Sequence, residues 1–253
     1  MEPPPSVELT FRLLGPVQAW RRGCELALGS PQQRSTLAIL LLRNGELVTM
    51  DEFVDAIWGA HAPRTAVNTV RTYVCRLRQL LPAGDGFGIS SIAGGYRLDT
   101  PEGTIDVDRL RRHLGRARTA SRQGDLRTAT DQLRSALALP AGRPLVGTAG
   151  PYLDQHRRAL EHLIATAGED QQAIAIESGH HQEAIGELTR AVAANPLRER
   201  PRILLMTALY RNGQQADALA QYQEARTLFH EELGMEPGDG LRGIHHRILT
   251  GTV

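Results

Sequence analysis

The chain of 253 residues contains no lysine, because all 29 of its basic residues are arginine. A phosphate-binding loop of the G-x-x-x-x-G-K-[ST] type, a protein kinase and a Schiff-base enzyme each need a lysine amine at a defined position. The missing lysine therefore excludes these three classes. The bias toward arginine, alanine, glycine and leucine also fits a GC-rich genome, and the exclusions hold whatever its cause.

Cysteine and long apolar runs are scarce as well. The two cysteines, Cys24 and Cys75, lie far apart and match no metal-ligand or redox spacing, which favours a reducing cytoplasm. The first residues, MEPPPS, lack the basic and apolar regions of a signal peptide. The longest aliphatic run, Leu37 to Leu42, is too short to cross a bilayer. We expect a cytoplasmic protein with no membrane segment.

Catalytic and metal-binding motifs are also missing from the sequence. There is no G-x-S-x-G motif and no constellation of cysteine and histidine. The pairs His180-His181 and His245-His246 do not have the H-E-x-x-H spacing, and no carboxylate completes a site around them. We interpret them as polar residues of loops or helix ends, and we expect no enzymatic activity, no metal and no cofactor.

Strand and helix patterns alternate over the first hundred residues. A strand over Val7–Gly15 ends at a Gly-Pro turn, and two shorter strands follow in the sequences VQAW and CELAL. A helix is expected from Pro31 to a stop at Asn44-Gly45. The sequence ELVTM then adds a short strand. These patterns predict a small N-terminal sheet followed by a helix.

Two more helices and a hairpin complete the order of a winged helix. Asp51 is expected to cap the second helix. Thr65 is expected to cap the third helix, which runs to Leu81 and is ended by the Pro-Ala-Gly sequence that follows. The sequence GISSIAGGYRL, from Gly88 to Leu98, predicts two strands around a tight turn at Gly94-Gly95.

The third helix is amphipathic and carries concentrated positive charge. Its apolar residues fall within one arc of the helix, and they are Val67, Val70, Val74, Leu77 and Leu81. The opposite arc carries hydroxyl, amide and arginine side chains, and no acidic residue occurs between Asp55 and Asp85. Arginine and asparagine bind base edges in the major groove, and flanking arginines suit phosphates. We predict that this helix recognises DNA; a solvated helix face is the alternative.

From about Thr104 onward, a helical repeat replaces the strand patterns. The pattern G-x-x-x-x-A-x-x-x-[LY]-x-x-A begins at Gly124, Gly179 and Gly213. The last two copies are 34 residues apart, which is the tetratricopeptide period. The sequence LPAGRPLVGTAGPY and a longer helix separate the first two copies. The repeats predict a groove that binds protein or forms dimers.

A basic run, Arg109–Arg122, has its own apolar stripe at Val107, Leu110, Leu114 and Ala117. We interpret it as a solvated helix, with contact to DNA or to the first domain as the alternative. Beyond residue 100, nineteen arginines balance nineteen acidic residues, so this half is not expected to be a general nucleic-acid surface.

Several segments, in order, resemble a known family. The sequences FRLLGP, PQQRSTLAILLL, AIWG, VRTYVCRLRQLL and GGYRL look like the winged-helix DNA-binding domain of response regulators. The sequence from Asn195 to Gly238 looks like the bacterial transcriptional activator domain. Together they resemble the Streptomyces antibiotic regulatory protein family from about Val7 to Leu249. The resemblance implies a pathway-specific activator of secondary-metabolite gene clusters that binds direct repeats near promoters and recruits RNA polymerase through its sigma subunit.

The resemblance also implies which residues contact DNA. The residues directed at base edges are Asn68, Arg71, Thr72 and Arg76. The phosphate contacts are Tyr73, Arg78, Arg34 and Arg97, with a plain surface role as the alternative for Arg34. Wings of this family commonly carry an arginine just before the turn. This chain has Ile92-Ala93 there, which favours reading by the helix over insertion of the wing into the minor groove.

We therefore expect an α+β winged helix with an N-terminal antiparallel sheet in residues 1–100, and an all-α tetratricopeptide-like bacterial transcriptional activator domain in residues 101–253. The expected function is transcriptional activation in the cytoplasm, at the nucleoid, with double-stranded DNA and RNA polymerase as partners. Whether two protomers bind DNA as a homodimer is left open. The alternatives are a helical-repeat scaffold with a degenerate winged helix, and a repressor that uses the same DNA contacts.

Overall fold

A computed structural model describes residues 9–81, 83–84 and 86–253. Their contacts divide the chain into two compact units. Unit 1 comprises Met1–Gly115 and Ser135–Leu163, and unit 2 comprises Arg116–Arg134 and Ile164–Val253. The predicted domain boundary near residue 100 divides the sequence once and stays a prediction. The compact units are defined by packing instead, and packing brings the later segment Ser135–Leu163 into unit 1.

Unit 1 begins with the predicted N-terminal sheet. Its strands are β1 (Leu9–Arg12), β2 (Gln18–Arg21) and β3 (Cys24–Glu25), paired antiparallel in that order. Phe11 of β1 lies opposite Ala19 of β2, and both are buried. Burial alternates along β1, as expected for a strand with one face on a core. The predicted start of this strand at Val7 lies outside the described residues.

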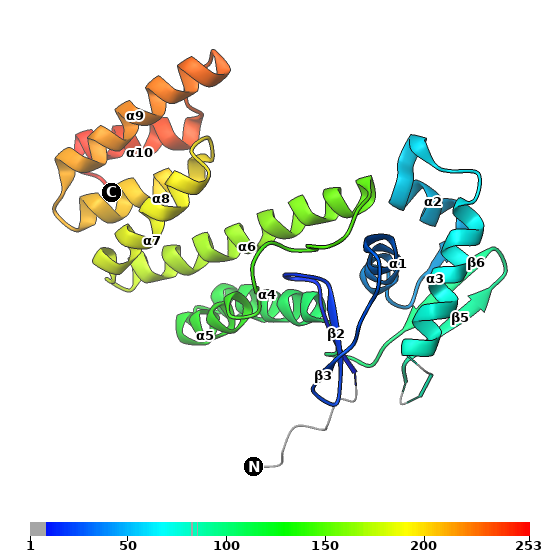
Figure 1. Ribbon diagram of the computed structural model, residues 1–253. Helices are drawn as coiled ribbons and strands as arrows, with labels where there is room; N and C mark the ends of the chain where they lie inside the picture. The colour runs from blue at the N-terminus through cyan, green and yellow to red at the C-terminus, as the bar shows by residue number, and fades with distance from the viewer. Residues whose placement is uncertain (1–8, 82, 85) are drawn as a thin grey trace, which may run out of the picture. The chain divides into compact units, whose positions relative to one another are not determined.

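The winged helix follows in the predicted order of elements (Figure 1). These elements are α1 (Pro31–Leu42), β4 (Leu47–Thr49), α2 (Met50–Trp58), a 3-10 turn (Gly59–His61), α3 (Ala66–Leu80), β5 (Gly88–Ile92) and β6 (Gly95–Asp99). The second sheet has the antiparallel order β4-β6-β5, so β6 lies in its centre. The expected fold class is confirmed for this part of the chain. Of the Pro-Ala-Gly sequence expected to end α3, the proline lies outside the described residues.

Two predicted helix caps in unit 1 are wrong. Thr49, and not Asp51, caps α2: its hydroxyl accepts from the Glu52 amide, and the Glu52 carboxylate accepts from the Thr49 amide at 2.8 Å. This reciprocal pair is a capping box, and it forms because β4 already ends in an extended residue at Thr49. Thr65 makes no side-chain cap for α3, because its own backbone is already in the helical region.

The remaining helices carry the predicted repeat. They are α4 (Asp106–Arg122), α5 (Leu126–Leu137), α6 (Pro151–Glu177), α7 (His181–Ala194), α8 (Glu199–Arg211), α9 (Gln215–Leu233) and α10 (Asp239–Thr250). Gly124, Gly179 and Gly213 lie in the turns between paired helices and have φ values of 76°, 84° and 80°. This left-handed conformation is the one that glycine adopts without strain. The repeat pattern therefore marks the helix pairs correctly.

The small residues of the repeat are in the core of unit 2, as predicted. Ala184, Ala218 and Ala225 are fully buried in one apolar cluster with Leu188. The histidine prediction needs a correction, because His245 lies inside α10 and stacks on Tyr222 with ring centroids 3.9 Å apart. Among the described residues, no helix combines the length and the apolar character that crossing a membrane requires.

Candidate nucleic-acid interface

Helix α3 has one buried and one exposed face. The buried face is formed by Ala66, Val70, Val74 and Leu77, and Leu81 just after the helix is buried too. Val67, which the periodicity assigns to this face, is only half-buried, and Ala66 takes the buried position beside it. α3 packs against α1 and α2. The apolar face therefore fixes the helix to its domain and determines which side chains face outward.

The predicted base-contacting residues lie together on the exposed face of α3. Asn68, Arg71, Thr72 and Arg76 are all exposed. The Thr72 hydroxyl donates to the Asn68 carbonyl at 2.9 Å, so this hydroxyl is bound to the helix backbone. Arg71 Nη1 donates to the Asn68 side-chain oxygen at 3.3 Å, so these two side chains are already paired on the helix surface. Cys75 is exposed beside Arg76. Tyr73 is half-buried on the flank of the helix.

Arg78 differs from the other arginines of α3 because its guanidinium binds the wing. Its Nε donates to the Ile89 carbonyl at 2.9 Å, and its Nη2 donates to the Ser91 hydroxyl at 2.9 Å. Its Cζ also lies 5.4 Å from the centroid of the Tyr96 ring. The first two contacts are on β5 and the third is on β6. Sequence reasoning grouped Arg78 with the phosphate contacts and missed these interactions.

The wing is short and tightly held. Ile92 pairs with Gly95, so the turn between β5 and β6 has only two residues, Ala93 and Gly94. The Gly94 carbonyl accepts from the Met50 amide at 2.9 Å. A Cβ atom at Gly95 would lie 2.0 Å from the Val48 carbonyl oxygen, so only glycine fits there. The other predicted contact of the wing, Arg97, forms an ion pair with Asp99 at 3.0 Å.

Arg34 is half-buried in α1 and contacts an irregular segment, residues 140–150, which we call the strap. Arg34 Nε donates to the Gly147 carbonyl at 2.9 Å. The neighbouring Ser35 hydroxyl donates to the Ala149 carbonyl at 2.8 Å and accepts from the Ala149 amide at 2.9 Å. Arg34 therefore has a structural contact in the protein, and its predicted phosphate contact remains untested.

The strap also pairs with the turn that follows β1. Backbone hydrogen bonds join them from Ala141 to Leu14, from Leu145 to Leu13, from Val146 to Gly15 and from Val17 to Val146. Arg157 of α6 donates to the carbonyls of Pro144 and Leu145 at 3.0 and 3.1 Å. Gly150, at the end of the strap, lies so close to α2 that a Cβ atom would be 2.3 Å from the Ala56 carbonyl oxygen. The strap is thus an integral part of unit 1.

A buried carboxylate supports the same turn. The two oxygens of Asp106 accept from the amides of Leu13 and Leu14 at 2.8 and 2.9 Å. Burial raises the pKa of the Asp106 carboxyl, although these amides and the one at Val107 act in the opposite direction. No sequence pattern indicated this residue, because a single aspartate at the start of a helix is common.

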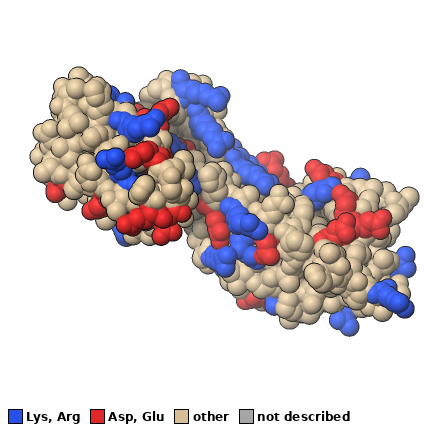
Figure 2. Space-filling model, turned by 90° about the horizontal axis from the view of Figure 1, so that it is seen from above, with Lys and Arg blue, Asp and Glu red and all other residues tan. Residues whose placement is uncertain are grey.

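Charge on the protein surface is mixed rather than uniform. Figure 2 shows arginine and carboxylate side chains on the same face of the molecule. In the run Arg109–Arg122, Arg111 and Arg112 form ion pairs with Asp108 and Glu102 at 3.7 and 2.7 Å, and the apolar stripe of the run is buried as predicted. The exposed arginines of α3 therefore stand out by their position beside Asn68 and Thr72 and not by the total charge.

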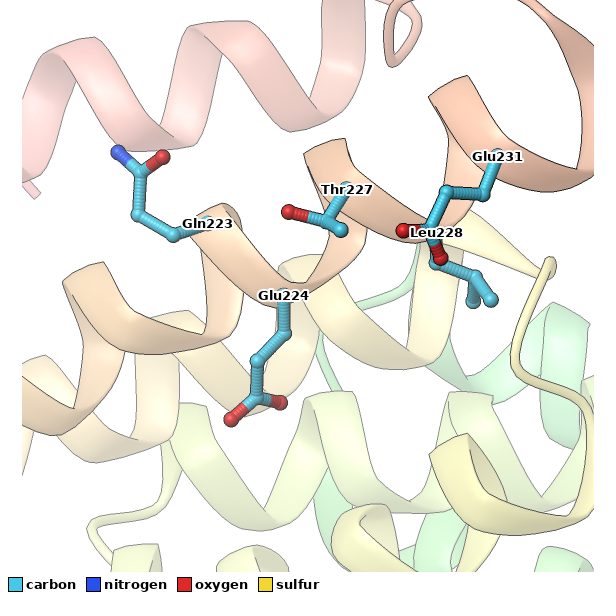
Figure 3. A pocket seen from close by; sticks show the side chains of 5 residues that line it. All are labelled: Gln223, Glu224, Thr227, Leu228 and Glu231. Atoms are coloured by element: carbon cyan, nitrogen blue, oxygen red, sulfur yellow. The ribbon is translucent and has the colours of Figure 1, made fainter.

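Unit 2 has a groove of its own on α9. The groove has a volume of about 520 Å³ and is lined by Gln223, Glu224, Thr227, Leu228 and Glu231 (Figure 3). Its lining combines two carboxylates with one leucine. Glu224 already accepts from the Gln221 side chain at 2.9 Å, and the protein-binding role that the repeats predict stays a prediction.

The two parts of the chain match two family models. Residues 25–98 match the family described as transcriptional regulatory protein, C terminal. Residues 105–249 match the bacterial transcriptional activator domain, which is more than half of the chain. The solved structure of Mycobacterium tuberculosis EmbR, in complex with a low-affinity phosphopeptide, superposes with a TM-score of 0.88 and 28% sequence identity over 98% of this chain and 66% of that one.

Curated relatives extend over nearly the whole chain. The chain is 46% identical to the regulatory protein AfsR of Streptomyces coelicolor over 96% of its own length, but it spans only 24% of AfsR. It is 36% identical to the transcriptional regulatory protein MoaR1 of Mycobacterium tuberculosis, of which it covers 78%. It is 32% identical to the transcriptional regulator RedD of Streptomyces coelicolor, of which it covers 70%. With its winged helix joined to a bacterial transcriptional activator domain, the chain belongs to the Streptomyces antibiotic regulatory protein family of transcription regulators.

Proposed function

We propose that the chain activates a secondary-metabolite gene cluster by binding direct repeats near its promoter and recruiting RNA polymerase through the sigma subunit. The observation that carries the DNA-binding part is the exposed face of α3, where Asn68, Thr72 and Arg76 recur one turn apart opposite a fully buried apolar face. A helix of this kind fits the major groove, where such side chains distinguish base pairs.

Seven of the eight predicted contact residues have a defined DNA contact in this proposal, and the exception is Arg78, whose guanidinium binds the wing. Asn68, Arg71, Thr72 and Arg76 face the bases, and Tyr73 contacts a phosphate at the flank of the groove. Arg34 contacts a phosphate through the nitrogens that do not bind Gly147. Arg97 contacts a phosphate from the wing by exchanging its ion pair with Asp99 for one with DNA. The wing itself does not enter the minor groove, because its turn has two residues and carries no arginine.

Direct repeats place two protomers side by side on the DNA, and the helical-repeat unit supplies the contacts with a second protomer or with polymerase. The acidic and apolar groove on α9 is one such surface. A gel-shift experiment with the promoter of the neighbouring biosynthetic genes tests DNA binding, and binding should weaken steeply as salt rises. Absence of binding at low salt would refute the proposal.

Replacing Arg76 with alanine tests sequence reading. Arg76 is exposed on α3, and a bidentate contact with a guanine would make Arg76→Ala lose roughly 1–3 kcal/mol of specific binding while binding to random DNA changes little. The measurement is the dissociation constant on the operator and on a scrambled duplex at the same salt concentration. An equal loss on both duplexes would show that Arg76 contacts only the backbone.

Two alternatives use the same structure. The short wing and the near-neutral net charge of +1 are also compatible with a helical-repeat scaffold that has a degenerate winged helix. A pull-down that recovers stable protein partners, without DNA retention at low salt, would support that scaffold. A repressor would make the same DNA contacts, and run-off transcription with and without the protein distinguishes it from an activator.

A further inference from the structure

Arg78 makes three contacts with the wing. An arginine that only binds a DNA phosphate would need none of them. Two of its nitrogens donate to β5, at the Ile89 carbonyl and the Ser91 hydroxyl, and its guanidinium lies over the Tyr96 ring of β6. Hydrogen bonds from a charged donor are stronger than neutral ones, and the flat guanidinium fixes both direction and distance.

The contact continues from the wing into the core of the domain. The Tyr96 ring meets the Phe53 ring of α2 edge-on, with centroids 6.3 Å apart, and Phe53 is fully buried. The far end of the wing is held separately by the Met50 amide and by the close approach of Gly95 to Val48. Arg78 thus adds two charged hydrogen bonds to the packing between the recognition helix and β5, in a wing that is also attached to α2 and β4.

We propose that Arg78 is a positioning residue that locks α3 and the wing into one rigid body, and that it sets the angle at which α3 meets the DNA rather than binding a phosphate. This inference rests on DNA binding by α3. An arginine two positions earlier, Arg76, offers a matched comparison, because it is exposed on the same helix.

The conservative variant Arg78→Lys separates the two roles. Lysine keeps the positive charge and binds phosphate well, but its single ammonium group cannot make both β5 hydrogen bonds and stack on Tyr96 in the same geometry. If Arg78 is a positioning residue, Arg78→Lys and Arg78→Ala should both lose roughly tenfold in operator affinity, keep their affinity for scrambled DNA and keep the salt dependence of the native protein.

Hydrogen exchange provides a readout that needs no DNA. Amides of Ile89–Ile92 should exchange faster in Arg78→Lys and Arg78→Ala, because β5 loses its two hydrogen bonds from α3, whereas Arg76→Ala should leave them unchanged. Ser91→Ala, which removes one acceptor and leaves the fold intact, should show a smaller increase in exchange. The double variant Arg78→Ala with Ser91→Ala should show no more loss of affinity than Arg78→Ala alone.

Two results would overturn the inference. In the first, Arg78→Lys binds the operator like the native protein, while Arg78→Ala weakens binding to operator and scrambled DNA equally and lowers the salt slope by about one, as loss of one phosphate contact predicts. In the second, exchange of the β5 amides is unchanged in all Arg78 variants. Failure of the native protein to bind the operator would refute the proposed function, whereas the exchange measurement would still test the link.

Discussion

The contacts within unit 1 join residues that are far apart in the sequence, whereas the contacts within unit 2 join helices that are close in the sequence. In unit 1, the Asp106 carboxylate binds the Leu13 amide 93 positions away, and the Ser35 hydroxyl binds Ala149 across 114 positions. In unit 2, packing joins helices that are close in the sequence, chiefly α7 with α8 and α8 with α9. Unit 1 therefore depends on individual distant contacts, and unit 2 depends on the repetition of similar ones.

The two units also differ in the reason why glycine is needed at particular positions. In the repeat turns of unit 2, Gly213 has a left-handed backbone, but there is open space where a Cβ atom would lie. In unit 1, Gly150 has a φ of 120° and also lacks room, because the Ala56 carbonyl and Ile57 fill the space. Glycine is needed in unit 2 for its backbone conformation, and in unit 1 for the close approach of two segments as well.

The largest expected effect comes from comparing these two glycines. Gly150→Ala should lower the free energy of unfolding of unit 1 by about 3 kcal/mol or more, because the methyl group collides with the backbone of α2. Gly213→Ala should cost unit 2 only about 1–2 kcal/mol of backbone strain. Urea unfolding followed by tryptophan fluorescence reports unit 1, because Trp20 and Trp58 both belong to it, and circular dichroism follows the helices of unit 2 as well. Equal losses would remove the contrast between the units.

The second comparison uses two aspartates of α4, and it tests the distant contact itself. Asp106→Ala should destabilise unit 1 by roughly 2–4 kcal/mol, because two buried amides lose their acceptor. Asp108→Ala removes only a partly exposed partner of Arg111 and should cost less than about 1 kcal/mol. The fluorescence unfolding curve measures both variants. A loss for Asp106→Ala as small as that for Asp108→Ala would show that the β1 turn does not depend on this carboxylate.

The smallest effect concerns the capping box of α2. The hydrogen bond from the Thr49 amide lowers the pKa of Glu52, and Arg43 contributes less to this shift. The ionised carboxylate therefore stabilises the folded state fully above the unfolded pKa of 4.5. This stabilisation is lost as the pH falls through the lower pKa of the folded state. Glu52→Gln should cost less than about 1 kcal/mol near pH 7 and should flatten this acid dependence. The measurement is the midpoint of thermal unfolding of both proteins between about pH 3 and about pH 7, the range in which carboxyl groups titrate.

The described helices α7, α8 and α9 of unit 2 begin without a side-chain cap. Because Glu52 belongs to unit 1, the unfolding of unit 2, followed by circular dichroism, should not respond to the Glu52→Gln change. If both units respond alike, they unfold together in one cooperative transition, and their stabilities cannot be compared separately.

Local patterns in the sequence predicted most elements of the fold and the exposed face of α3. The three-and-four spacing of Val70, Val74 and Leu77 predicted which side of this helix is buried, and the repeat glycines predicted the helix pairs. The strap was seen only as an interruption of the repeats. Its hydrogen bonds to the β1 turn use backbone groups of an irregular segment, and such pairing has no periodic pattern in the sequence.

Side-chain roles that depend on distant partners were equally hidden. The sequence showed that Arg78 is cationic and lies on the flank of α3, but not that Ile89 and Ser91 accept from its guanidinium. The cap at Thr49 was missed for a related reason. The end of β4 decides which residue is extended enough to cap α2, and a neighbouring aspartate resembles a cap equally well in the sequence.

The close contact between Gly95 and the Val48 backbone also limits where the wing of this regulator can be redesigned. Because no side chain fits at Gly95, the wing cannot gain a DNA-contacting residue by substitution at that position. The turn at Ala93 and Gly94 is the place where the hairpin can be lengthened, since Ala93 is exposed and a Cβ atom at Gly94 would meet open space. An insertion there that carries an arginine is the direct engineering route to adding a minor-groove contact to the proposed reading of the major groove by α3.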